Sequence, residues 1–118
     1  MKIYTYKKCG SCQKAIKWLK DHNCNYEEFP IRDQIPKISE LEQMLSSYDG
    51  EIKKLFNTSG KDYREMDYKN KITSKTNEQL LDDLSKNGNL IKRPFVLSKN
   101  CNLVGFSAKI WEIKFQLS

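Results

Sequence analysis

Ile3-Tyr4-Thr5-Tyr6 and, two lysines later, Cys9-Gly10-Ser11-Cys12 place a pair of cysteines directly after a strand-like run. Residues 11–22 then have a helical pattern, in which lysines lie opposite an apolar face. That face consists of Ala15, Ile16, Trp18 and Leu19. Residues 25–29 have the character of a second strand, which Pro30 closes. Together these segments predict a β-α-β unit of about 30 residues, as a parallel crossover requires.

The middle of the chain has helical patterns. Ser39 and Glu42 have the spacing of a capping box, which predicts that a helix begins at this point. Asp49-Gly50 marks a turn, and residues 52–56 fit a short helix. Residues 76–87 fit a longer helix that ends at Gly88.

The last third of the chain predicts a hairpin and a helix. Residues 94–98 and 103–106 flank the turn Lys99-Asn100 and predict two antiparallel strands. Ser107 can cap a final amphipathic helix. The apolar residues of that helix are Ile110, Trp111, Ile113 and Phe115. The order is therefore β-α-β, a helical insert at about 31–90, and β-β-α, within one domain that spans residues 1–118.

Charge and hydropathy narrow the class of protein. The formal net charge is +6, which suits an anionic substrate or an acidic protein partner. The arginines are only Arg32, Arg64 and Arg93, so we expect no direct DNA binding. No apolar run approaches the ~20 residues of a membrane span, and the N-terminus lacks the apolar core of a signal peptide. We therefore expect a cytoplasmic protein, away from membranes, whose thiols are mostly reduced.

The two cysteines of residues 9–12 predict redox chemistry. A sulfur at a helix N-terminus lies near unpaired backbone N–H groups and the positive end of the helix dipole, and both stabilise thiolate. Lys7, Lys8 and Lys14 add positive charge. Cys9 is therefore the expected nucleophile, and Cys12, one turn further along, is expected to resolve a mixed disulfide. The backbone N–H groups of Gly10 and Ser11 would support the thiolate or a bound oxygen.

Two other interpretations of the cysteine pair stay open. Cys9 and Cys12 could form half of a zinc site. The remaining candidate ligands, His22, Cys24 and Cys101, do not have the spacing of a zinc motif, so we predict no metal. Both thiols could also be small structural residues.

Three motifs follow one another along the chain. The first is Tyr6-Lys7-Lys8-Cys9-Gly10-Ser11-Cys12-Gln13-Lys14-Ala15, followed by Trp18-Leu19. The second is Leu55-Phe56-Asn57-Thr58-Ser59-Gly60-Lys61-Asp62-Tyr63-Arg64, and the third is Leu90-Ile91-Lys92-Arg93-Pro94-Phe95-Val96, followed by Val104-Gly105-Phe106. In order and spacing they resemble the arsenate reductase-like (ArsC/Spx/MgsR) family of the thioredoxin-like superfamily. The resemblance covers essentially the whole chain.

This resemblance implies a fold and a site. The fold is α/β, thioredoxin-like and of the glutaredoxin type, with a four-stranded mixed sheet and a helical insertion between the βαβ and ββα halves. Pro94 would be the cis-proline that faces the cysteine loop, and Arg93 would help to bind an oxyanion. Lys8 is a further candidate for the anion site. Two other arginines of the family are replaced here by Asn57 and Gly105, which argues against efficient arsenate reduction.

The second cysteine and one turn point to another branch of the family. Spx-type regulators carry a CxxC pair as a redox switch, as Cys9 and Cys12 would be here. Asp49-Gly50 falls near the glycine through which Spx-type proteins contact the α-subunit of RNA polymerase. Gly50 is therefore the candidate for partner binding.

The residues and the resemblance together leave three functions. The first is a thiol–disulfide oxidoreductase in which Cys9 attacks and Cys12 resolves. The alternatives are an Spx-like redox-sensing regulator that binds the RNA polymerase α-subunit, and an arsenate reductase coupled to glutaredoxin and glutathione. We expect no bound cofactor, with glutathione at most a co-substrate. We also expect a glutaredoxin- or thioredoxin-type reductant and a monomeric protein.

Overall fold

Four short strands form one mixed sheet in the computed structural model, which describes residues 1–115. The strands are β1 (Lys2–Thr5), β2 (Glu27–Pro30), β3 (Phe95–Leu97) and β4 (Asn102–Val104). Their order across the sheet is β2-β1-β3-β4, with β1 and β2 parallel and the other two pairs antiparallel. The predicted β-α-β unit, hairpin and mixed sheet are therefore confirmed.

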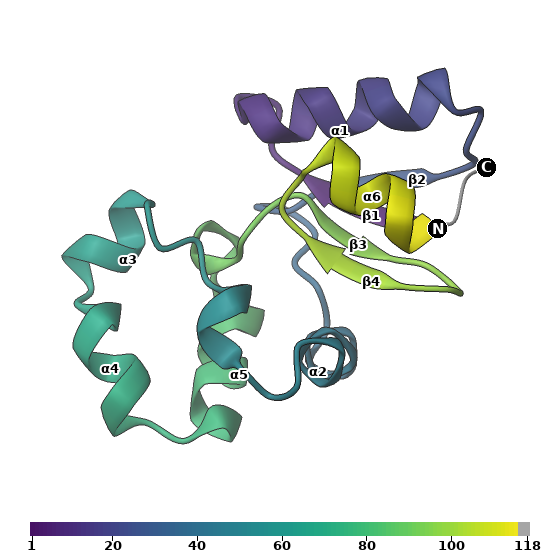
Figure 1. Ribbon diagram of the computed structural model, residues 1–118. Coiled ribbons are helices and arrows are strands. Elements are labelled where there is room, and N and C mark those ends of the chain that lie inside the picture. The colour runs from purple at the N-terminus through teal and green to yellow at the C-terminus, as the bar shows by residue number, and fades with distance from the viewer. Residues whose placement is uncertain (116–118) are drawn as a thin grey trace.

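The sheet separates two hydrophobic clusters because successive side chains of a strand point to opposite faces. Ile3, Val96 and Leu103 pack on one face against α1 (Gly10–Asp21) and α6 (Ala108–Phe115). Figure 1 shows these two helices together above the sheet. Helix α1 contributes Ala15, Trp18 and Leu19, and α6 contributes Trp111.

The helical insert lies between β2 and β3 and contributes to the other cluster. Its elements are α2 (Ile38–Ser47), the 3-10 turn η1 (Ile52–Leu55), α3 (Lys61–Glu65), α4 (Tyr68–Ser74), α5 (Asn77–Lys86) and the 3-10 turn η2 (Gly88–Leu90). From β1 and β3, Tyr4 and Phe95 reach into this cluster. In Figure 1 the insert forms a second lobe below the sheet, with α2 next to β4. Within residues 1–115 no helix is long and apolar enough to cross a membrane.

Helix α2 begins two residues earlier than a Ser39–Glu42 capping box predicts. The residue before its first turn is Lys37, whose backbone N–H donates to Glu40 Oε1 over 3.0 Å. The prediction of a capping box formed by Ser39 and Glu42 is therefore wrong. Glu40 also accepts from the Tyr4 hydroxyl at 2.8 Å and from Lys2 Nζ at 3.3 Å. This carboxylate, whose side chain is only 12% exposed, ties the start of the insert to β1.

We expect Glu40→Gln to lower the free energy of unfolding by about 1–3 kcal/mol near neutral pH, since it weakens charge-assisted hydrogen bonds. Burial raises the pKa of Glu40, but the bonds from Lys37, Tyr4 and Lys2 outweigh it and lower that pKa overall. A group whose folded-state pKa is depressed stabilises the fold above its unfolded value. That contribution is lost as the pH falls through the folded value. Urea unfolding should thus show a difference between wild type and variant at about pH 7 that shrinks by about pH 3. An equal difference at both pH values would contradict this account.

Helix α6 is less amphipathic than the sequence predicts. Ser107 Oγ accepts from the Ile110 backbone N–H at 3.4 Å, so the predicted cap is present. Trp111 is buried, but Ile110 and Ile113 are 50% and 65% exposed. Trp111 therefore faces the core, and Ile110 and Ile113 do not. The two isoleucines line a groove, which is described below.

Candidate active site

Cys9 occupies the cap position at the N-terminus of α1. Its sulfur accepts a hydrogen bond from the backbone N–H of Cys12 over 3.3 Å, and its own N–H donates to the Tyr6 carbonyl at 2.9 Å. The first turn of α1 contains no acidic residue. The Cys9 sulfur is half-buried, so it meets both the helix dipole and solvent. This position gives the sulfur a backbone hydrogen-bond donor and leaves the residue partly exposed.

Cys12 has a different environment. It lies inside the first turn of α1 and is 2% exposed. Burial raises the pKa of the Cys12 thiol, and the neighbouring Cys9 side chain raises it further. A backbone hydrogen bond with Tyr6 and the charge of Arg93 only partly oppose this shift. Cys12 therefore remains protonated under conditions in which an exposed thiol begins to ionise.

The helical insert reaches the cysteine loop through a short antiparallel contact. Phe56 forms an isolated bridge with Ile91. Asn57 N–H donates to the Leu90 carbonyl, and Lys92 N–H donates to the Leu55 carbonyl, each over 2.8 Å. These bonds place the segment that follows Phe56 beside the segment that leads to Pro94.

A cavity of about 360 Å³ opens between the cysteine loop and the insert. Its lining consists of Tyr6, Lys8, Cys9, Ser11, Asn57, Ser59, Gly60, Lys92 and Arg93. In the part of the chain that the structure describes, the ionisable lining side chains besides Cys9 and Tyr6 are all cationic, and none is a carboxylate. The cavity therefore suits an anionic group next to the Cys9 sulfur. We refer to it as the Cys9 cavity.

Arg93 is held in place by its backbone and by an aromatic ring. The Arg93–Pro94 peptide bond is cis, as the resemblance implies. The Arg93 guanidinium carbon lies 5.1 Å from the centroid of the Tyr6 ring, and that of Arg32 lies 3.9 Å from the same ring. Among residues 1–115, Arg93 Nη1 is buried and finds no hydrogen-bond partner. A buried donor of this kind has unused capacity to bind an anion.

Asn57 and Gly105 are the two positions at which this chain lacks an arginine that the family resemblance implies for the anion site. Asn57 lines the cavity, so its amide stands where a guanidinium would add charge. Gly105 has φ +78°, and a Cβ built on it would lie 3.0 Å from Lys92 Cε. An arginine at Gly105 would therefore be strained in this backbone conformation. Among the lining residues, the positive charge comes from Arg93, Lys8 and Lys92.

The structure brings together most of the candidate site residues. Cys9, Ser11, Lys8 and Arg93 line the Cys9 cavity. Gly10 is the exposed first residue of α1, and the Cys12 and Pro94 side chains are buried beside the cavity-lining residues that adjoin them in the chain. Gly50 lies elsewhere, in an exposed turn after α2, with φ +79°.

Several cavity residues were not singled out from the sequence. Tyr6, Ser59 and Gly60 carry no charge that would mark them. Their proximity depends on the Phe56–Ile91 bridge, which joins residues far apart in the chain. Cys24 and Cys101 are free and half-buried, and neither lines the Cys9 cavity.

Comparison with known proteins shows the family to which the chain belongs. The model of the ArsC family matches residues 4–113. The chain belongs to the ArsC family. It is 38% identical over 110 residues to the uncharacterised protein YusI of Bacillus subtilis, with 93% of both chains covered.

A solved structure and a transcriptional regulator are also similar to this ArsC-family chain. The crystal structure of an ArsC family related protein from Bacteroides fragilis has a TM-score of 0.87 and 37% identity, covering 96% of this chain and 97% of the other. The fold is thus the thioredoxin-like α/β fold. The global transcriptional regulator Spx of Listeria innocua is 26% identical over 105 residues, which cover 89% of this chain and 79% of the regulator.

Proposed function

We propose that this ArsC-family protein is a thiol–disulfide oxidoreductase in which Cys9 is the nucleophile and Cys12 the resolving thiol. The observation that carries the proposal is the unequal environment of the two sulfurs. The Cys9 sulfur caps α1, is accessible and adjoins a cationic cavity, whereas Cys12 is buried one turn away. An accessible nucleophile next to a buried thiol, whose pKa burial raises, suits sequential attack and resolution.

The reaction proceeds in two exchanges. The Cys9 thiolate attacks one sulfur of a substrate disulfide, the substrate S–S bond breaks, and the departing thiolate takes up a proton. Cys12 then loses its proton to solvent and attacks Cys9, which releases the second substrate thiol and leaves a Cys9–Cys12 disulfide. The substrate has gained two electrons, and the cysteine pair has lost them. A dithiol or glutathione-dependent reductant of the glutaredoxin or thioredoxin type returns the pair to the reduced state.

The Cys9 cavity favours substrates that carry negative charge near the reacting sulfur. Lys8, Lys92 and Arg93 supply cations, and Arg93 Nη1 is free to donate. A mixed disulfide with glutathione has carboxylates that could meet these groups. Arsenate reduction is less well supported, because Asn57 and Gly105 stand where the family has arginines. We place the activity in the cytoplasm, where reduced thiols are available.

The test of this proposal is turnover of a disulfide substrate with the single-cysteine variants. Reduction of hydroxyethyl disulfide by glutathione should depend on the Cys9 thiol.

A second candidate function is an Spx-like regulator, which the similarity to the Spx of Listeria innocua supports. The exposed turn at Gly50 would then contact the RNA polymerase α-subunit. Its main-chain conformation, with φ +58° at Asp49 and +79° at Gly50, presents the turn outward at the end of α2. The Cys9–Cys12 disulfide would act as the switch.

The substitution Gly50→Arg tests this second function. No atom lies within 4 Å of a Cβ built on Gly50, so a side chain has space, although its positive φ costs about 1 kcal/mol. Gly50→Ala carries the same backbone cost without the bulk and is the matched control. If the protein docks through this turn, Gly50→Arg should lower its affinity for the purified α-subunit at least about tenfold, while Gly50→Ala changes it little. Equal binding by all three proteins would exclude Gly50 as the docking site.

A further inference from the structure

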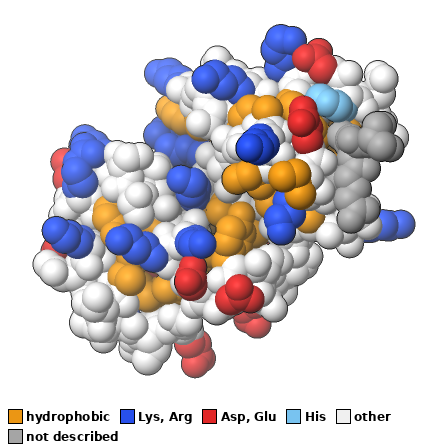
Figure 2. Space-filling view, viewed as in Figure 1, with side chains coloured by type: hydrophobic (Ala, Val, Ile, Leu, Met, Phe, Trp, Pro, Cys, Tyr) orange, Lys and Arg blue, Asp and Glu red, His pale blue; other side chains and the backbone are white. Residues whose placement is uncertain are grey.

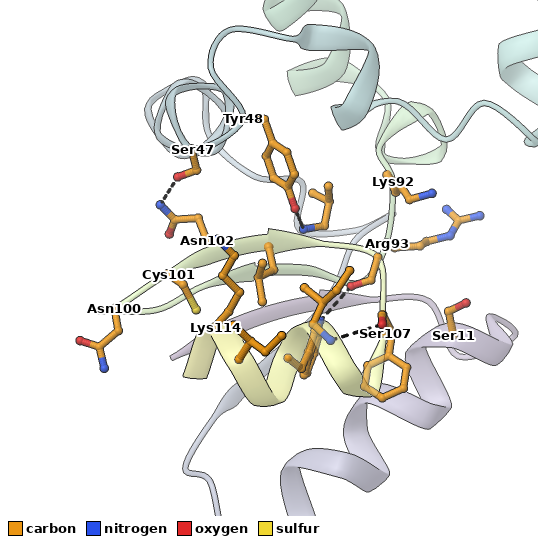
Figure 3. A pocket seen from close by; sticks show the side chains of 17 residues that line it. Ser11, Ser47, Tyr48, Lys92, Arg93, Asn100, Cys101, Asn102, Ser107 and Lys114 are labelled. Atoms are coloured by element: carbon orange, nitrogen blue, oxygen red, sulfur yellow. Dashed lines mark hydrogen bonds between the residues drawn. The ribbon is translucent and has the colours of Figure 1, made fainter. Parts of the chain in front are cut away.

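A groove of about 960 Å³ runs along β4, between α6 on one side and the end of α2 on the other. Figure 3 shows Lys92, Arg93 and Ser11 at one end and Asn100 at the other. The floor and walls include the side chains of Leu103, Val104, Phe106, Ile110, Trp111 and Ile113. We call this feature the β4 groove.

The wall on the α2 side is fixed by hydrogen bonds to β4. The Tyr48 hydroxyl accepts from the Val104 backbone N–H over 3.0 Å. Asn102 Nδ2 donates to Ser47 Oγ over 2.9 Å, and Asn102 Oδ1 accepts from Gln43 Nε2 at 3.1 Å. These contacts, two of which are drawn in Figure 3, hold the groove open between the sheet and the insert.

The opposite wall exposes apolar side chains. Ile110 and Ile113 are 50% and 65% exposed, although both are large hydrophobic residues on α6. Helical spacing of three residues places them side by side. Figure 2 shows hydrophobic side chains over α6 and in the hollow below it, next to Lys and Arg side chains. Apolar surface of this kind, next to polar groups, is typical of a docking site.

The charge of the β4 groove has one sign. Among residues 1–115, its lining includes Lys92, Arg93 and Lys114 and no acidic residue. Asn100, Asn102, Ser47 and Ser107 provide polar groups without charge. A complementary occupant therefore combines apolar side chains with carboxylates.

The β4 groove is continuous with the Cys9 cavity. Ser11, Lys92 and Arg93 line both. An occupant of the groove would thus have one end beside the Cys9 sulfur. The groove runs the length of β4, from Asn100 to Lys92 and Arg93, and this elongated form suits an extended chain rather than a compact molecule.

We propose that the β4 groove binds an extended, acidic polypeptide segment, whose apolar side chains contact Ile110 and Ile113 and whose carboxylates face Lys114 and Lys92. This proposal rests on the proposed function and extends it by assigning the substrate class. The substrate is a protein disulfide within an acidic segment, which the groove presents to Cys9. Binding itself needs no redox step and can be measured separately.

The binding test uses two synthetic peptides of eight residues that lack cysteine and carry a fluorescent label. One alternates aspartate with leucine or valine, and the other has lysine in place of each aspartate. Fluorescence anisotropy with the reduced wild-type protein should show at least about tenfold tighter binding of the acidic peptide. That preference should decrease as the salt concentration rises. Equal affinity for the two peptides, or no binding of either, would overturn the proposal.

Matched variants locate the binding surface. The double variant Ile110→Ser/Ile113→Ser and the single variant Lys114→Glu should each weaken binding of the acidic peptide at least about fivefold. The control Ile38→Ser/Met66→Ser removes two apolar side chains that are each 42% exposed outside the groove. The control Lys69→Glu makes the same charge change on α4. Both controls should bind as wild type does, and equal losses in variants and controls would show that the groove is not the site.

A second copy of this chain is the alternative occupant. If the apolar wall instead formed a dimer, the apparent mass in size-exclusion chromatography would rise with protein concentration. It would fall in Ile110→Ser/Ile113→Ser but not in Ile38→Ser/Met66→Ser. That result, without peptide binding, would overturn the proposal in favour of self-association.

A turnover measurement separates this inference from the proposed function. The acidic peptide with one added cysteine, as its mixed disulfide with 2-mercaptoethanol, is compared with hydroxyethyl disulfide. The groove variants should lower kcat/KM for the peptide at least about fivefold and leave hydroxyethyl disulfide unaffected. Peptide binding without turnover of either disulfide would remove the proposed function and keep the groove as a binding site. Cys9-dependent turnover of both disulfides, with kcat/KM for the peptide unchanged in the groove variants, would keep the proposed function and remove the groove as the substrate-binding site.

Discussion

Replacing Cys9 by serine should lower kcat/KM for reduction of hydroxyethyl disulfide at least about 10³-fold, because a serine hydroxyl neither ionises nor exchanges with a disulfide. The fold should remain intact. Serine is also a favoured helix cap, so its oxygen can accept the Cys12 N–H that the Cys9 sulfur accepts at 3.3 Å. Turnover is measured with glutathione as the reductant, and unfolding by urea serves as the check on stability.

Cys12→Ala is the informative partner variant. It removes the resolving thiol and keeps the nucleophile, so with hydroxyethyl disulfide and no added glutathione a stable adduct on Cys9 should accumulate and be visible by mass spectrometry. The free cysteines Cys24 and Cys101 do not line the Cys9 cavity, and serine at either position should leave turnover within about twofold. Turnover that survives in Cys9→Ser, or that Cys24→Ser abolishes, would contradict the assignment of the nucleophile.

Gly88→Ala should cause the largest loss of stability among the single substitutions discussed, about 3 kcal/mol or more in the free energy of unfolding. A Cβ at this position would lie 2.2 Å from the Ile31 carbonyl oxygen and 2.9 Å from the Ile31 carbonyl carbon. Both atoms belong to the backbone, so no side chain can turn aside to relieve the clash. Gly88 begins η2 and packs against the connection that follows β2, so the end of the insert must shift away from the sheet.

Gly10→Ala is the matched control for that substitution. No atom lies within 4 Å of a Cβ built on Gly10, and the residue is helical. Alanine there should leave the stability unchanged or raise it by up to about 1 kcal/mol. Thermal unfolding distinguishes the two, with a decrease of about 10 °C or more in Tm for Gly88→Ala only. A Gly88→Ala protein as stable as wild type would show that the close approach to Ile31 is relieved without cost.

Local patterns in the sequence were sufficient to predict most of the secondary structure. The helix of α1, the hairpin of β3 and β4 and the cap at Ser107 follow from periodicity and turn residues that lie near one another in the chain. The start of α2 was misplaced because Glu40, rather than Glu42, makes the capping bond, and its choice depends on Tyr4 and Lys2 of a distant strand.

The site was predicted from local chemistry at the two cysteines and from the family resemblance at Arg93 and Pro94. Cys9 and Cys12 were identified by their spacing and their place before a helix. The Asn57 side of the Cys9 cavity depends on the Phe56–Ile91 bridge, and no local pattern indicates that pairing. The exposure of Ile110 and Ile113 was also missed, because an apolar residue on a helix predicts burial unless a neighbouring surface is absent. Both errors concern contacts between segments rather than the segments themselves.

In the proposed mechanism, Cys9 and Cys12 form a reversible disulfide during turnover. The pairing can be measured by equilibrating the protein with glutathione buffers or dithiol buffers of defined potential, alkylating the remaining thiols and mapping the cysteine peptides. We predict a two-electron transition confined to Cys9 and Cys12, with a midpoint at about −220 to −320 mV, near the potential of cytosolic thiols. A Cys9–Cys12 pair that stays unlinked over the whole range would contradict the account.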